Sequence, residues 1–191
     1  MSQKILLVTN EAEKNDLLES YLLENSYTVS RSVLADNKIQ ESILVMRPDV
    51  VIIYIEKAEE SILSTIQLIQ QNTPLPIIIF AQRSKDKLIA EAITAGASGF
   101  VIDGVEKHRI CPIIEVATAR FNKCQSIKIK LTETELKLNE RKDIDRAKGI
   151  LMSKKSIKED EAYQLLRKMA MDKNVRMGEL AKTIITASEL L

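Results

Sequence analysis

The chain has 191 residues, of which 45% are apolar and 29% charged, and its formal net charge is +1. This is enough material for one large domain or two modest ones with buried cores. The near-neutral charge excludes a protein that holds nucleic acid through a global basic field, so any such partner needs a local patch. We see no leader peptide and no apolar run near the ~18 residues of a membrane span. We therefore expect a cytoplasmic protein with no membrane contact.

Short apolar, β-branched runs alternate with amphipathic helical stretches over residues 1–105. Near-continuous apolar strands separated by helices predict a parallel sheet that is covered on both faces. The expected fold class is therefore α/β, a flavodoxin-like, doubly wound domain of five strands whose functional crevice lies at the carboxyl ends of the strands. The expected strands are Ile5–Val8, Tyr27–Ser30, Val50–Tyr54, Ile77–Phe80 and Gly99–Ile102, and the expected helices are Glu11–Glu24, Asp36–Met46, Glu59–Gln70 and Lys85–Ala95.

From Glu106 onward, apolar residues at intervals of seven replace the strand pattern. Sustained heptads predict a coiled coil, which would pair two chains through a linker helix at residues 106–138. The same spacing fits a lone amphipathic helix packed on its own domain, and Lys128 and Glu135 interrupt the second line of the seam. The predicted dimer seam comprises Ile110, Ile114, Ala117, Phe121, Cys124, Leu131 and Leu138.

Residues 139–191 are predicted to be helical throughout, as a small three-helix bundle. Ser156–Glu159 has the form of a capping box, and apolar residues follow it at helical spacing. Asp172–Asn174 is the expected break before a last helix, and Ala147 and Gly149 are expected to let another helix approach closely. From Glu140 to the end, the sequence has twelve Lys and Arg against nine Asp and Glu, so the tail is its more basic part.

The motifs at residues 48–53 and 95–101, with this order of strands and helices, resemble response-regulator receiver domains. In that family, carboxylates after the first and third strands bind Mg²⁺ and accept phosphate, while a hydroxyl and a lysine contact the phosphoryl group. None of the corresponding positions here carries the group that the family uses there; they are Thr9, Asn10, Tyr54, Ala81 and Asp103. Because Mg²⁺ sites depend on carboxylate oxygens, the resemblance predicts a degenerate receiver, residues 1–105, that is not phosphorylated.

The altered crevice has two interpretations. Either it has drifted, with Tyr54 packing over a space that no longer holds an ion, or it has become a docking surface for an effector-binding sensor protein. Phe100 lies where receivers carry their switch aromatic. The stretch from Asp103 to Phe121 resembles the nitrate-assimilation branch of these regulators, which favours the docking interpretation.

The tail carries the most specific pattern, which is R-x-x-I-D-x-A-K-G-x-L-M at residues 141–152, E-x-E-A-Y at 159–163 and L-R-x-x-A-M at 166–171. It resembles the ANTAR domain, the RNA-binding module of amide- and nitrate-regulated transcription antiterminators; Ser156 departs from it, since many members have glycine there. The resemblance implies that an ANTAR domain at residues 139–191 binds hairpin loops in a transcript leader and prevents a terminator from forming. RNA polymerase would be affected only indirectly, and two loops would require a homodimer.

A basic rim on a small helical bundle suits phosphate contacts and stacking of guanidinium planes on unpaired bases. Tyr163 either stacks on a base or is a buried core aromatic. Replacing Lys148 or Arg167 with alanine is expected to weaken hairpin binding and to leave thermal stability unchanged. The predicted RNA-binding residues are Arg141, Lys148, Arg167, Lys168, Lys173 and Arg176.

Other classes of function are less well supported by the sequence. We expect no enzyme, no cofactor and no metal site, because phosphate-loop, nucleophile-elbow and metal-ligand motifs are missing and His108 is the single histidine. Cys111 and Cys124 lie thirteen residues apart on one expected helix, too far to bridge within a chain. A DNA-binding response regulator, which would show a helix–turn–helix, and a protein-interaction adaptor are the alternatives.

Overall fold

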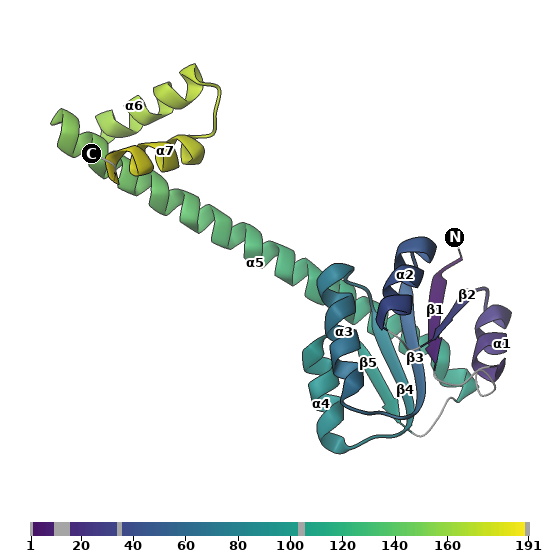
Figure 1. Cartoon of the computed structure of the whole chain (residues 1–191). Helices are drawn as coiled ribbons and strands as arrows, with labels where there is room; N and C mark the ends of the chain where they lie inside the picture. The colour runs from purple at the N-terminus through teal and green to yellow at the C-terminus, as the bar shows by residue number, and fades with distance from the viewer. Residues whose placement is uncertain (1, 10–15, 34–35, 103–105, 190–191) are drawn as a thin grey trace. The chain divides into compact units, whose positions relative to one another are not determined.

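The computed structural model describes residues 2–9, 16–33, 36–102 and 106–189 (Figure 1). The chain divides into two compact units, Met1–Gln125 and Ser126–Leu191. The helices are α1 Asp16–Glu24, α2 Asp36–Met46, α3 Ser61–Asn72, α4 Asp86–Ala95, α5 Lys107–Lys155, α6 Glu159–Asp172 and α7 Met177–Glu189. The strands are β1 Lys4–Thr9, β2 Thr28–Val33, β3 Val50–Lys57, β4 Ile77–Arg83 and β5 Gly99–Ile102.

The first unit is a five-stranded parallel sheet in the order β2-β1-β3-β4-β5, so the predicted flavodoxin-like α/β fold is confirmed. Its central strands are buried on both faces, which is why they are apolar along almost their whole length. Helices α2, α3 and α4 cover one face, and α1 and the first turns of α5 cover the other (Figure 1). Strand β3 continues for three residues past the predicted end at Tyr54.

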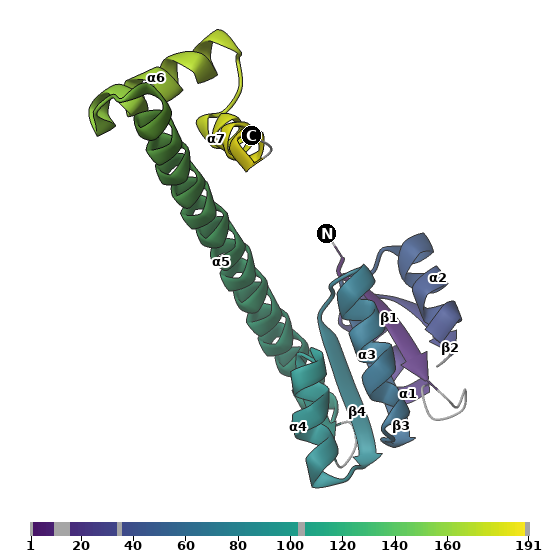
Figure 2. The same cartoon turned by 60° about the vertical axis from the view of Figure 1, so that its left-hand side comes forward.

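Helix α5 is unbroken over 49 residues (Figure 2). The linker predicted at residues 106–138 and the first helix of the tail are therefore one element. Its first turns belong to the receiver-type unit and its last turns to the helical unit. Along the chain, the first unit ends at Gln125 and the second begins at Ser126, within α5. The boundaries predicted from the sequence, after residues 105 and 138, lie just before this helix and within it.

In the second unit, the last turns of α5 pack with α6 and α7. The core of this three-helix bundle consists mainly of small and aliphatic side chains, which are Ala147, Leu151, Ala162, Leu166, Ala170, Leu180 and Ala181. Alanines at these contacts let the helix backbones approach closely. The predicted Gly149 contact is wrong, however, because no described neighbour lies within 4 Å of a Cβ placed there.

The predicted capping box lies two residues too early in the chain. Ser156 has a φ of 54°, a left-handed conformation that follows the end of α5 and explains why glycine suits this position. The residue that precedes α6 is Lys158, whose backbone N–H donates to the Glu161 carboxylate at 3.0 Å. Glu161 thus satisfies one of the amide groups that have no partner at the start of a helix.

No helix among the described residues is long and apolar enough to cross a membrane.

Candidate nucleic-acid interface

A cavity of about 430 Å³ opens where α5 meets α6 and the start of α7. We call it the α5–α6–α7 cavity. It combines cationic groups, carboxylates, an aromatic ring and two apolar side chains. The lining residues are Lys137, Glu140, Arg141, Ile144, Asp145, Lys148, Tyr163 and Met177. A concave site with a few polar groups and an accessible ring has the composition expected for a base or another planar ligand.

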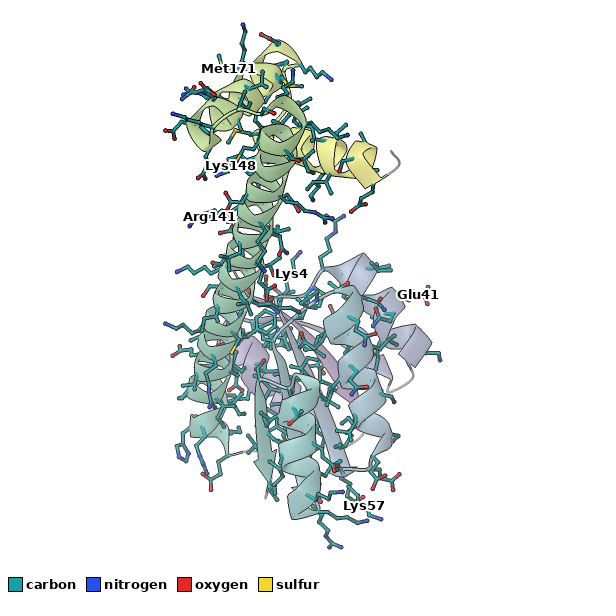
Figure 3. All side chains as sticks on the ribbon, turned by 90° about the vertical axis from the view of Figure 1, so that its left-hand side faces the viewer. Lys4, Glu41, Lys57, Arg141, Lys148 and Met171 are labelled. Atoms are coloured by element: carbon teal, nitrogen blue, oxygen red, sulfur yellow. The ribbon has the colours of Figure 1, made fainter. Side chains whose placement is uncertain are left out.

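Arg141 is the exposed cation of this cavity that the sequence predicted. It leaves α5 on the same side as Lys148 (Figure 3). Among the described residues, no carboxylate lies within ion-pair distance of its guanidinium group, although the Arg141 charge helps to lower the pKa of Asp145. Lys137 lies four residues earlier on the same face and is also exposed. Lys137 is not among the RNA-binding residues predicted from the sequence, since it lies before the motif.

Lys148 is engaged within the unit. Its Nζ lies 2.8 Å from Asp145 Oδ1 and 2.8 Å from Glu159 Oε1, and its side chain is only 14% exposed. The hydrogen bonds to Asp145 and Glu159 raise the pKa of Lys148, and the hydrogen bond from Lys148 lowers the pKa of Asp145. The Lys148–Glu159 pair links α5 to the first turn of α6, whereas the Asp145–Lys148 pair lies within α5. The contribution of the Asp145–Lys148 pair to stability is present at neutral pH and is lost as pH falls through the lowered pKa of Asp145.

The Lys148 contacts change one expectation. Replacing this lysine with alanine leaves two carboxylates without their shared partner, so the variant should lose thermal stability as well as any ligand contact. Loss of hairpin binding in a Lys148 variant would therefore not identify an RNA contact. Arg141 is the better residue for that purpose.

Tyr163 is not a core residue. Its side chain is 39% exposed and lines the cavity from α6. By helical spacing, Arg167 lies one turn further along the same face of α6 and exposed Met171 a further turn on. Met171 is labelled in Figure 3. A part-exposed ring beside exposed guanidinium groups can stack on an unpaired base.

The other predicted cations are exposed but do not line the cavity. Lys168 is five residues after Tyr163, which turns it away from the Tyr163 face of α6. Lys173 caps the C-terminus of α6, and Arg176 precedes α7, where its backbone N–H donates to Glu179 at 3.4 Å. Of the six predicted RNA-binding residues, the cavity thus brings together Arg141 and Lys148.

The receiver crevice contains no carboxylate at its three described positions. Thr9 is buried and is paired in register with Tyr54 on the neighbouring strand. Tyr54 packs against the core on the α1 and α5 side, and its hydroxyl accepts a 3.4 Å hydrogen bond from Gln82. Ala81 is buried in the opposite core. Asn10 and Asp103 lie outside the described residues.

The predicted dimer seam needs correction in its first half. Ile110, Ile114 and Ala117 are buried against the sheet of their own unit, so they are not available to a second chain. Phe121 is half-buried and Cys124 is exposed. Further along α5, Leu131 is 57% and Leu138 54% exposed, and Ile127 is exposed on the same side. Of the predicted seam, Cys124, Leu131 and Leu138 are exposed, and together with Ile127 they form an apolar stripe on α5.

Two glycines of the helical unit give opposite expectations for alanine. At Gly178, a Cβ would lie 2.4 Å from Glu140 Cγ, so alanine requires the exposed Glu140 side chain to move to another rotamer and should cost roughly 0.5–1.5 kcal/mol of unfolding free energy. At Gly149, exposed within α5, alanine meets nothing and should add about 0.5–1 kcal/mol. Thermal melts of the two single variants check this. Equal effects of the same sign would contradict the packing of α7 on α5.

Comparison with known proteins identifies the helical tail. Residues 132–185 match the ANTAR domain. The chain is 24% identical over 183 residues to the transcriptional regulatory protein PdtaR of Mycobacterium tuberculosis, covering 96% of this chain and 89% of that protein. It is 37% identical over 78 residues to the nitrate regulatory protein of Klebsiella oxytoca, covering 41% of this chain and 20% of that protein.

The first unit is similar in fold to solved receiver domains. One of them, from a putative LuxO repressor protein of Vibrio parahaemolyticus, is 18% identical with a TM-score of 0.56, and the match covers 66% of this chain and 98% of that one. In this chain an ANTAR domain therefore follows a receiver-type fold, as the sequence resemblance predicted. The α5–α6–α7 cavity lies within the ANTAR domain.

Proposed function

We propose that this protein is an RNA-binding regulator of transcription antitermination. The observation that carries the proposal is the α5–α6–α7 cavity inside the ANTAR domain, which is lined by Arg141 and Lys137 from α5 and by the exposed ring of Tyr163 from α6. Guanidinium groups and aromatic rings are the groups on which proteins stack the unpaired bases of RNA loops. The loop of a leader hairpin enters the cavity, and the bound RNA no longer folds into the terminator.

The acting species is a homodimer that binds two hairpin loops of one leader. The exposed stripe of Cys124, Ile127, Leu131 and Leu138 on α5 supports this part of the proposal, since four apolar side chains at helical spacing favour burial against a second copy. Two linked tails bind two linked loops far more tightly than one tail binds one loop.

The receiver-type unit controls the tail without phosphorylation, most simply by docking an effector-binding sensor protein of the nitrate-assimilation type. The preserved receiver scaffold with an altered crevice supports this. Pull-down from the native cell extract, with and without nitrate or nitrite, should recover a partner whose binding depends on the effector. Recovery of no such partner would favour intrinsic, unregulated RNA binding.

A gel shift tests the function directly. The probes are paired stem-loops from untranslated leaders of the source genome and duplex DNA of the same sequence. We expect a shift with the RNA that weakens steeply with salt, because phosphate contacts release counterions. Preference for the duplex DNA would support a DNA-binding response regulator, and binding of neither probe would support a protein-interaction adaptor.

Control by the receiver-type unit without phosphorylation can be tested separately. Thr9, Tyr54 and Ala81 supply no carboxylate for Mg²⁺ or for phosphate transfer. Acetyl phosphate with Mg²⁺ should therefore neither label the protein nor change its affinity for hairpin RNA. The measurements are acid-labile phosphate in the N-terminal half and titration of the RNA before and after treatment. Recovery of an acyl phosphate from that half would overturn the prediction.

A further inference from the structure

Helix α5 carries a row of cations that runs into the α5–α6–α7 cavity. Lys130 and Lys137 are seven residues apart, and Arg141 follows four residues later. Intervals of seven and four keep all three side chains on one face of a helix, and the row spans about 16 Å at 1.5 Å per residue. We call these three residues the basic row. Lys137 and Arg141 line the cavity, whereas Lys130 lies before the segment that matches the ANTAR domain.

None of the three cations of the basic row is neutralised by an acidic side chain among the residues that the structure describes. All three side chains are exposed, and no ion pair joins any of them to another described residue. Glu133, Glu135 and Glu140 lie close to the row in sequence, and among the described residues none of these acids forms a salt bridge with a cation of the row. Thr134, on the same face, donates its hydroxyl to the Lys130 carbonyl at 2.8 Å and adds no charge. Lys148, in contrast, is neutralised by Asp145 and Glu159.

We propose that the basic row extends the RNA site along α5 and binds the phosphates of the hairpin stem while the loop occupies the cavity. This inference rests on the proposed function. A stem offers charged groups in a regular line that starts where the loop ends, which matches a line of exposed cations that ends in the cavity. Double-stranded RNA is recognised largely through its backbone, so cations without base-reading groups are sufficient for the stem.

Lys130 is the residue that separates stem binding from loop binding, because it does not line the cavity. Lys128 is its matched control: both lysines are exposed, and each accepts at its carbonyl a hydrogen bond from a threonine four residues later. Two residues apart on a helix, they point to different faces. A second chain offers Lys130 a different partner, since Glu135 lies at the spacing of an interchain pair in a parallel coiled coil. Sedimentation of the variants reports on that possibility.

The experiment measures hairpin affinity against salt for the full chain, for Lys130→Gln and for Lys128→Gln. One leader stem-loop is used with its full stem and again with the same loop on a shortened stem. We expect Lys130→Gln to weaken binding of the full stem several-fold. Its log affinity should also fall less steeply with log salt, the magnitude of the slope being smaller by about 0.7–0.9, which is the value of one phosphate contact. The shortened stem should bind both variants as it binds the unaltered chain.

Three results overturn the inference. Equal binding of the full stem by Lys130→Gln and Lys128→Gln, with tight binding by the unaltered chain, would leave the loop site intact and remove the stem site. Weaker association of two chains in Lys130→Gln, with no change in the salt slope, would assign Lys130 to a contact with the second chain. No binding of either hairpin by the unaltered chain refutes the proposed function, and the stem site with it.

Discussion

Replacing Leu131 with lysine should separate the two chains and reduce affinity for a two-loop leader by about 100-fold or more. Leu131 is in the middle of the exposed stripe on α5, and a charge there cannot be buried against a second helix without a large desolvation cost. Loss of the dimer removes the advantage of two linked tails, which is worth about 10²–10⁴ in affinity. Binding of a single stem-loop should be unchanged. Sedimentation and titrations with one-loop and two-loop RNA measure both effects.

Leu136 supplies the matched control. It is at least as exposed as Leu131 but lies five residues further along, on a different side of α5. Leu136→Lys should therefore leave the dimer and its RNA affinity intact. Mild oxidation gives an independent reading, since Cys124 lies in the stripe and should cross-link two parallel chains, whereas Cys124→Ser should not. An unaltered chain that sediments as a monomer at tens of micromolar, and still binds two loops tightly, would refute the dimer.

Replacing Arg141 with glutamine should weaken hairpin binding by about 1–3 kcal/mol, which is roughly 5- to 150-fold, and leave the thermal midpoint nearly unchanged. The guanidinium group lines the α5–α6–α7 cavity and, among the described residues, forms no ion pair that the substitution would break. Lys142→Gln removes the same charge at the next position, outside the cavity, and should have a small effect. The measurements are hairpin titrations and thermal melts of both variants.

Substitutions at two further positions distinguish a binding defect from a folding defect. Lys148→Ala should lower both the thermal midpoint and the affinity, because this side chain connects α5 to α6. Tyr163→Leu should lower affinity without unfolding the unit, while Tyr163→Phe, which keeps the stacking face, should bind almost normally. Normal hairpin binding by a folded chain with Arg141 and Tyr163 both replaced would show that RNA occupies a different face.

The strands and the tail motif could be read from the sequence because both are local patterns. A run such as Val50–Tyr54 is apolar on both faces only when helices cover both sides of the sheet. The heptads of α5 were ambiguous for a physical reason: a helix that packs on its own sheet and a helix that pairs with a second chain share the same spacing. Burial divides the predicted seam into two parts, since Ala117 faces the sheet and Leu131 faces solvent.

The contacts of the candidate site could not be read from the sequence because they join distant residues. Lys148 finds Glu159 across a helix boundary, and Glu140 packs against Gly178 almost forty residues later. Spacing within one helix carries no information on such pairs. Helical spacing could have predicted Lys137, because it lies on the same face of α5 as Arg141, one turn earlier. Lys137 was overlooked because it lies outside the motif.

Burial of Ile110, Ile114 and Ala117 against the sheet has a consequence for synthesis. The last strand ends at Ile102, yet the apolar face that includes Leu7, Ile52 and Phe80 is covered only by α1 until the chain has been made as far as Ala117. At about 5–20 residues per second, those fifteen residues take about 1–3 s. During that interval the nascent sheet has all its strands but lacks half of the cover on this face, and its apolar side chains are open to aggregation and to chaperones.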